Sequence, residues 1–263
     1  MSLSVDGLSV RYLERGDGAP VVLLHGASLG SSADVWARNL PALAQHGLRI
    51  VAVDLPGFGG TDNPPDPSVV YRKRFVLAFM DALSLERASL VGHSQSGRVA
   101  VDLAFDHPQR IAKVVVLGTG SLLPPLAEKQ DEGEEGGSSE PSLVDTRALL
   151  EANLYDRSLI TREALKTRHR MSVGKNFEAF LARKQAKGGK SSGEPPWQRV
   201  GKCPVPLLLL YGMEDRQAAE RAALAKDLFP NLDLRLLPRC GHLIQWDAAD
   251  TFADLAGRFL GDI

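Results

Sequence analysis

Short runs of apolar residues recur along the chain and alternate with longer amphipathic stretches. The clearest runs are rich in Val and Leu and are followed by glycine or another turn-forming residue; they cover residues 20–25, 50–55, 88–92, 114–117 and 205–211. Continuous apolar runs of this length are typical of strands buried on both faces of a parallel sheet. The stretches between them that are predicted to be helices are 68–85, 96–107, 218–228 and 248–260.

The beginning of the chain has a different pattern. Residues 3–5 and 8–14 flank Asp6-Gly7, which predicts a β-hairpin. A hairpin followed by alternating strands and helices indicates an α/β fold, with a mostly parallel sheet, flanking helices and right-handed crossovers.

Residues 121–200 interrupt this alternation, because no strand-like apolar run is obvious there. Two helical stretches are predicted at about 142–155 and 161–187, next to an acidic segment at 128–140 and a basic, Gly/Ser-rich segment at 183–193. Both charged segments are expected to be solvated loops that pair loosely at most. We therefore predict a core formed by 1–120 and 201–263, with 121–200 as a helical insertion.

Composition excludes several classes of function. The chain has 31 Lys+Arg against 32 Asp+Glu, and a protein that binds nucleic acid or anionic lipid needs a basic excess. Two cysteines, Cys203 and Cys240, are too few for a disulfide framework or a zinc site. The first residues lack signal-peptide features, and the apolar runs are too short to cross a bilayer. We expect a cytoplasmic protein without bound metal.

The most informative segment is Gly92-His93-Ser94-Gln95-Ser96, which joins a predicted buried strand to a predicted helix. This context indicates a nucleophile elbow, in which small residues on either side let a tight turn expose the serine hydroxyl. The second small residue is usually Gly; here it is Ser96, which is expected to crowd the turn slightly. His93 is expected to point away from the Ser94 hydroxyl.

A nucleophilic serine needs a base and an acid that orients the base. His242 follows the predicted strand 232–237, and Asp215 lies three residues after the glycine that ends strand 205–211, with Glu214 as the neighbouring alternative. The order Ser94, Asp215, His242 is that of the α/β-hydrolase fold. For the oxyanion hole, the backbone N–H groups of Gln95 and Ala27 are the predicted donors, and Gly26 gives the backbone the necessary freedom.

The chain resembles an α/β-hydrolase from end to end. The motifs that carry the match are 24–26 (LHG), 54–61 (DLPGFGGT), 92–96 (GHSQS), 212–216 (GMEDR) and 241–242 (GH). The insertion occupies the position of that family's helical lid. Within the superfamily the chain is most similar to the meta-cleavage product hydrolases, carbon–carbon bond hydrolases of aromatic catabolism that act on 2-hydroxy-6-oxohexa-2,4-dienoates. The segments behind this match are 156–165 (DRSLITREAL), 195–197 (PPW) and 239–247 (RCGHLIQWD).

The resemblance implies further site residues. Arg168 matches the lid arginine that binds the substrate carboxylate, for which a guanidinium is chemically suited. Other positions implied to contact substrate are Gly26, Ser28, His93, Leu243 and Trp246. The family often has Asn where this chain has His93 and Trp where it has Leu243, and its asparagine near the first core helix is replaced around 34–35. These departures bear on the identity of the substrate.

The resemblance also implies a mechanism and partners. The substrate is a small molecule, no cofactor is needed, and a homodimer or larger assembly is implied. The 2-hydroxydienoate must ketonise before Ser94 or water attacks the 6-oxo carbon, and the sequence leaves open an acyl-enzyme or a gem-diol route. A carboxylesterase or lactonase with the same triad is the alternative function. A non-enzymatic receptor on this fold is a second alternative, which a complete triad counts against.

Overall fold

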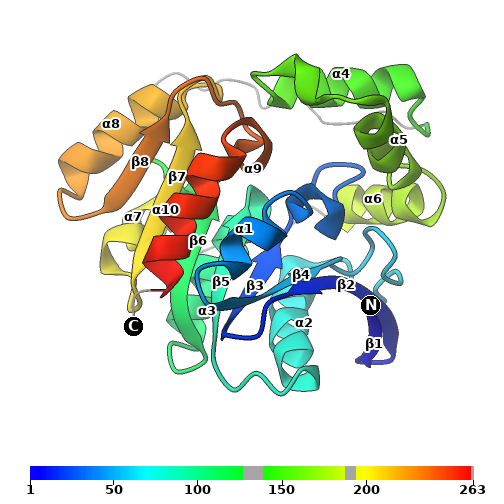
Figure 1. Cartoon of the computed structure of the whole chain (residues 1–263), viewed down its shortest axis with the longest axis horizontal. Coiled ribbons are helices and arrows are strands. Elements are labelled where there is room, and N and C mark those ends of the chain that lie inside the picture. The colour runs from blue at the N-terminus through cyan, green and yellow to red at the C-terminus, as the bar shows by residue number, and fades with distance from the viewer. Residues whose placement is uncertain (127–138, 187–193, 262–263) are drawn as a thin grey trace.

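The computed structural model describes residues 1–126, 139–186 and 194–261. The described residues contain an eight-stranded sheet in the order β1-β2-β4-β3-β5-β6-β7-β8 (Figure 1). Its strands are β1 (Ser2–Val5), β2 (Leu8–Arg15), β3 (Ala19–Leu24), β4 (Leu48–Val53), β5 (Ala88–His93), β6 (Ile111–Leu117), β7 (Leu207–Gly212) and β8 (Asp233–Leu237). β2 pairs antiparallel with β1 and β4, and the other pairs are parallel. The predicted α/β fold with a mostly parallel sheet is confirmed.

The hairpin and the buried strands follow from their sequences. Asp6 and Gly7 both have positive φ, at 50° and 80°, as a two-residue type I′ turn requires. Along β3, Val22 and Leu24 pack into one apolar cluster and Val21 and Leu23 into another, on the opposite face. A strand buried on both faces has no polar side to display, which explains its continuous apolar sequence.

Helices cover both faces of the sheet. α2 (Val69–Ala82), α3 (Gln95–Asp106) and α8 (Ala218–Leu228) contribute to one cluster, and α1 (Leu40–Ala44) and α10 (Ala249–Gly261) to the other. Figure 1 shows α1 and α10 in front of the sheet. The four long core helices were predicted, but the short α1 and the 3₁₀ turn η1 (Ala33–Trp36) before it were not. They are too short for a periodic apolar pattern.

The insertion lies between β6 and β7, over one end of the sheet (Figure 1). Its main helices are α4 (Leu143–Asn153), α5 (Arg162–Arg170) and α6 (Lys175–Ala186), followed by the short α7 (Pro196–Arg199). The prediction of one helix over 161–187 was wrong. The chain turns between α5 and α6, where Gly174 has φ of 60°, a conformation that favours glycine.

The charged segments of the insertion are only partly described. Residues 128–138 of the acidic run and 187–193 of the basic run lie outside the described residues. The expectation that the basic run is solvated is wrong for its first residue, because Arg183 is 9% exposed. In the described part of the chain, no helix is both long and apolar enough to cross a bilayer.

Candidate active site

Ser94 lies in a sharp turn between β5 and α3. Its φ and ψ are 55° and −127°, a conformation that is strained for any residue with a side chain. Two bonds hold the turn: the Ser94 N–H donates to Leu117 O (2.8 Å), and the Thr119 hydroxyl donates to Ser94 O (2.6 Å). A serine with a strained backbone, placed between a parallel strand and a helix, has the geometry of a nucleophile elbow.

The elbow requires small neighbours. A Cβ atom on Gly92 would lie 2.4 Å from Ser96 O and 2.6 Å from the Gly97 Cα atom, so any side chain would displace the helix start. Ser96, the second small residue of the elbow, makes a contact of its own. Its hydroxyl donates a 2.5 Å hydrogen bond to His25 O, and this bond ties the start of α3 to the loop after β3.

The carboxyl ends of β7 and β8 bring an acid and an imidazole together. The carboxylate of Asp215, three residues after β7 ends, lies 2.8 Å from the Nδ1 atom of His242. Glu214, the alternative acid, does not contact this ring; its carboxylate accepts the backbone N–H groups of Arg239 (3.0 Å) and Cys240 (2.7 Å). Asp215 is therefore placed to orient His242, while Glu214 holds the loop that precedes it.

His93 connects the elbow to the His242 loop. The Nε2 atom of His93 lies 3.0 Å from His242 O, and because a carbonyl only accepts, this nitrogen carries the proton. The two imidazole rings are 4.8 Å apart. Burial and the nearby His242 lower the pKa of His93 well below its usual value, so the ring is a neutral donor. Among the described residues no hydrogen bond joins the Ser94 hydroxyl to His242.

The His242 loop is also bound to the insertion. The Asp247 carboxylate accepts hydrogen bonds from the N–H groups of Gly241 (2.8 Å), Tyr155 (2.9 Å) and Asp156 (3.0 Å). Sequence analysis placed Asp247 in a family motif but gave it no role. One carboxylate thus fixes the chain after α4 against the loop that carries the imidazole.

The predicted oxyanion-hole residues lie where the loop after β3 meets the elbow. A Cβ atom on Gly26 would lie 2.9 Å from the Nδ1 atom of His93 and 3.3 Å from the Ser94 Cβ atom, so the approach requires glycine. Among the backbone hydrogen bonds of the described residues, none uses the N–H of Ala27 or of Gln95 at the start of α3. Both donors are thus available to a developing oxyanion.

Arg168 comes from the insertion and reaches the same loop. It is 7% exposed, and its Nη2 atom donates a 2.7 Å hydrogen bond to the Ser28 hydroxyl. Its charge is one of the causes that lower the pKa values of His25 and His93. The structure therefore brings Arg168, Ser28 and the Gly26 loop together.

The two other expected contact positions lie beside His242. Leu243 packs in an apolar cluster with residues of the insertion, namely Leu150, Leu154, Ile160 and Leu165. The indole N–H of Trp246 donates to Val35 O (2.9 Å), so this group is used within the protein. Leu243 thus forms an apolar surface next to the imidazole, and Trp246 holds η1.

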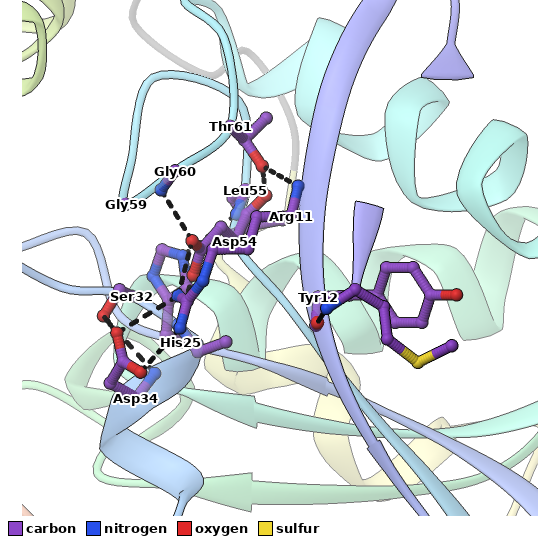
Figure 2. Close-up of polar contacts among 12 residues, drawn as sticks. Arg11, Tyr12, His25, Ser32, Asp34, Asp54, Leu55, Gly59, Gly60 and Thr61 are labelled. Carbon is purple, nitrogen blue, oxygen red and sulfur yellow. Dashed lines mark hydrogen bonds and ion pairs between the residues drawn. The ribbon is translucent and has the colours of Figure 1, made fainter. Parts of the chain in front are cut away.

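A partly buried ion-pair network supports the loops around the site, as Figure 2 shows. Asp54 is fully buried; its Oδ1 atom accepts the Ala33 N–H (2.5 Å), and its Oδ2 atom accepts from Gly60 N–H (2.7 Å) and Arg11 Nη1 (2.9 Å). Arg11 also pairs with Asp34 at 2.8 Å. Asp34 therefore belongs to this network. Sequence reasoning missed Arg11, because a lone arginine in an alternating strand gives no signal.

His25 is fully buried beside this network (Figure 2). Its Nε2 atom accepts the Leu55 N–H (3.0 Å) and its Nδ1 atom lies 2.7 Å from Gly26 O, so the ring is neutral with the proton on Nδ1. Burial is the main cause that lowers the pKa of His25 to about 4. The imidazole thus fixes the Gly26 loop against the chain after β4.

This lowered pKa predicts a pH-dependent stability. Between pH 6.5 and 4 the unfolded chain binds a proton at His25 that the folded protein excludes, so the free energy of unfolding falls as the pH drops through this window. The loss from this group approaches about 3 kcal/mol. Urea unfolding of the wild type and of His25→Gln at pH 7 and pH 4.5 measures it. The variant should show a smaller difference between the two pH values; an equal difference would contradict the assignment.

Comparisons with known proteins identify the family to which the chain belongs. Residues 19–249 match the alpha/beta hydrolase fold family, and the chain belongs to this family. A 2-hydroxy-6-oxononadienedioate/2-hydroxy-6-oxononatrienedioate hydrolase of Paraburkholderia phymatum is 31% identical over 97% of this chain and 91% of its own length. A 2-hydroxy-6-oxo-6-phenylhexa-2,4-dienoate hydrolase of Comamonas testosteroni is 33% identical over 95% and 91%. The solved meta-cleavage product hydrolase from Pseudomonas fluorescens IP01 superposes with a TM-score of 0.84 at 28% identity, covering 98% of this chain and 96% of the other.

These relatives confirm the finer resemblance. The chain is a hydrolase of the α/β-hydrolase family and a relative of the meta-cleavage product hydrolases. The likeness extends over nearly the whole length of both partners, including the insertion.

Proposed function

We propose that the protein hydrolyses a carbon–carbon bond in a 2-hydroxy-6-oxo-dienoate formed in aromatic catabolism. The observation that carries the proposal is the buried Arg168 guanidinium bonded to Ser28, next to the loop with Ala27. A dienoate carries a carboxylate that needs a bidentate cation, whereas a neutral ester does not. The names of the relatives support the same substrate class.

In the proposed mechanism, the Asp215 carboxylate accepts a hydrogen bond from the Nδ1–H group of His242, which leaves the Nε2 atom to take and return protons. Arg168 holds the carboxylate while the dienol ketonises. Ser94, or a water activated by His242, then attacks the 6-oxo carbon, and the N–H groups of Ala27 and Gln95 stabilise the oxyanion. The C5–C6 bond breaks, His242 returns its proton to the dienolate that leaves, and water supplies the hydroxyl of the released acid. The hydrogen bond between Ser94 and His242 is expected to form with substrate bound, since such bonds often tighten only then.

We also propose that residues 121–200 act as a lid over a core of 1–120 and 201–263. Contacts between the helices of the insertion and the loops of the core support this division. Asn153 O accepts the Leu243 N–H (3.0 Å), and the Lys175 ammonium donates to Thr61 O (2.8 Å). The hydrogen bonds between the insertion and the core involve loops, helices and side chains rather than paired strands, so the lid can separate from the core without breaking the sheet.

A substrate panel with one variant tests the function. The wild type should turn over a coloured meta-cleavage product with higher kcat/KM than short p-nitrophenyl esters. Arg168→Gln should raise KM for the dienoate about tenfold or more, because a hydrogen bond to a charged group is lost, and leave KM for the neutral esters unchanged.

The matched control is Arg162→Gln, an exposed arginine at the start of the same helix, which should keep wild-type KM for both substrates. Faster turnover of esters, with Arg168→Gln affecting both substrates equally, would favour the carboxylesterase or lactonase alternative. A solved N-acyl homoserine lactone degrading enzyme, 28% identical with a TM-score of 0.73, keeps that alternative relevant.

Assembly and location are part of the proposal. We propose a cytoplasmic homodimer acting on a small molecule. The thiols of Cys203 and Cys240 are both free, as expected in a reducing compartment. Light scattering of the purified protein measures the mass, and a monomeric mass at micromolar concentration would contradict the dimer.

A further inference from the structure

Two arginines outside the proposed catalytic centre are buried at the junction of the insertion and the core. Arg72 lies on α2 and is 6% exposed, and Arg183 lies on α6 and is 9% exposed. Sequence analysis expected Arg183 in a solvated loop and gave Arg72 no role. Neither is used by the mechanism above.

Neither guanidinium has a counter-charge within the described part of the chain. The Nη1 atom of Arg183 donates to Gly57 O (3.0 Å), and its guanidinium lies 3.8 Å from the centre of the Phe58 ring. The Nη2 atom of Arg183 and the Nη1 atom of Arg72 are buried without a hydrogen-bond partner. Arg11, by contrast, is matched by two carboxylates.

Arg72 and Arg183 together place positive charge in a buried region that has no negative group among the described residues to balance it. Burial lowers the pKa of Arg72 to about 10, and burial together with the charge of Arg72 lowers the pKa of Arg183 to about 9. Both groups are therefore cations at neutral pH and lie close enough to repel each other. Removing a charge from water without pairing it is costly, so buried charges in proteins are normally paired. The missing partner is negative.

The surrounding contacts hold the two arginines in place. Asn176, at the start of α6, donates to Gly59 O (3.2 Å), and a Cβ atom on Gly57 would lie 3.0 Å from both Arg183 Nη1 and the Ala179 Cβ atom. The segment 57–61 is therefore packed against α6. Preorganised, partly desolvated guanidinium groups are suited to bind a planar carboxylate or a phosphate-like oxyanion.

We propose that Arg72 and Arg183 form an anion-binding site between α2, α6 and the 57–61 loop, which takes a carboxylate or an oxyanion of similar size. This site is separate from Arg168, which lies on α5. The charges of Arg72 and Arg168 both contribute to the lowered pKa of His25. The ligand is either a free anion or a second carboxylate of the substrate itself.

Thermal unfolding at pH 7.5 and constant ionic strength tests the site without catalysis. Replacing chloride with 50 mM phosphate or acetate should raise the wild-type Tm by about 4 °C, with a saturable dependence on concentration. Arg72→Met and Arg183→Met should lose this gain. Each should also equal or exceed the wild-type Tm in chloride, because an unpaired buried charge is removed.

Arg74→Gln is the matched control, since Arg74 is exposed on the same helix, two residues from Arg72, and this variant should keep the full gain. Absence of any gain up to 100 mM anion would overturn the proposal. Full retention of the gain in both Met variants would do the same. If the Met variants do not fold, the wild-type titration decides: a saturable curve supports the site, and a linear one refutes it.

A kinetic comparison identifies the source of the anion and rests on the proposed function. If the substrate supplies a second carboxylate, Arg72→Met should lower kcat/KM about tenfold for a dienedioate, a class named for the Paraburkholderia phymatum relative, and leave a phenyl-dienoate unaffected. If the ligand is a free anion, Arg72→Met should change kcat/KM for the two substrates by the same factor. Should neither substrate be turned over, the proposed function fails, while the Tm measurement still decides on the anion site.

Discussion

Ser94→Ala should lower kcat for the dienoate substrate at least about 10³-fold while the protein remains folded. The nucleophile acts together with its base, so its removal eliminates most of the transition-state stabilisation that the triad provides. Alanine is strained by the same backbone conformation as serine at this position, where φ is 55°. The Tm of the variant should therefore stay close to that of the wild type. Single-turnover absorbance of the coloured substrate and thermal unfolding measure the two effects.

Ser94→Gly is the informative companion. Glycine adopts positive φ without strain, so this variant should be as inactive as Ser94→Ala yet about 1 kcal/mol more stable. A fluorophosphonate should label the wild type and neither variant. Wild-type protein that resists labelling would favour the non-enzymatic receptor, and full turnover by Ser94→Ala would remove the serine from the mechanism.

Asp215→Asn should lower kcat about 10³-fold or more, with KM little changed. The carboxylate lies 2.8 Å from His242 Nδ1, and an amide there would lose the charge and favour the wrong tautomer of the imidazole. Steady-state kinetics on the dienoate across pH 6–9 tests this prediction.

The neighbouring carboxylate provides the control. Glu214→Gln should reduce kcat less than tenfold and stability by about 1–2 kcal/mol, because Glu214 accepts the N–H groups of Arg239 and Cys240 and does not contact the imidazole. A greater loss of kcat in Glu214→Gln than in Asp215→Asn would reverse the assignment of the two acids.

The features predictable from sequence depend on local pattern. The buried strands have continuous apolar runs, and the elbow has two small residues at fixed distances from Ser94, so both leave a signature in adjacent positions. The partnership of Asp215 with His242 was predictable because parallel strands end at the same edge of a sheet. The resemblance placed Arg168, since a solitary arginine in a helix has no pattern of its own.

The features that sequence did not predict depend on contacts between distant segments. The break between α5 and α6 occurs at Gly174, within a run whose apolar spacing continues on both sides. Arg11 meets Asp34 and Asp54 only after three segments have folded together. The burial of Arg183 arises from packing on Phe58, and no property of a basic, glycine-rich run indicates it.

Asp247 has a consequence for how such enzymes diverge. Its carboxylate is shared by the N–H groups of Tyr155 and Asp156 from the insertion and of Gly241 from the loop before His242. A foreign insertion with a different backbone path there would leave the carboxylate partly unsatisfied and shift the imidazole. Chimeras that exchange the insertion alone should therefore lose activity on every substrate, whereas those that exchange it together with residues 239–247 should retain it. The insertion, which faces the substrate in the proposed function, and residues 239–247, which position the imidazole, are therefore expected to change together in evolution.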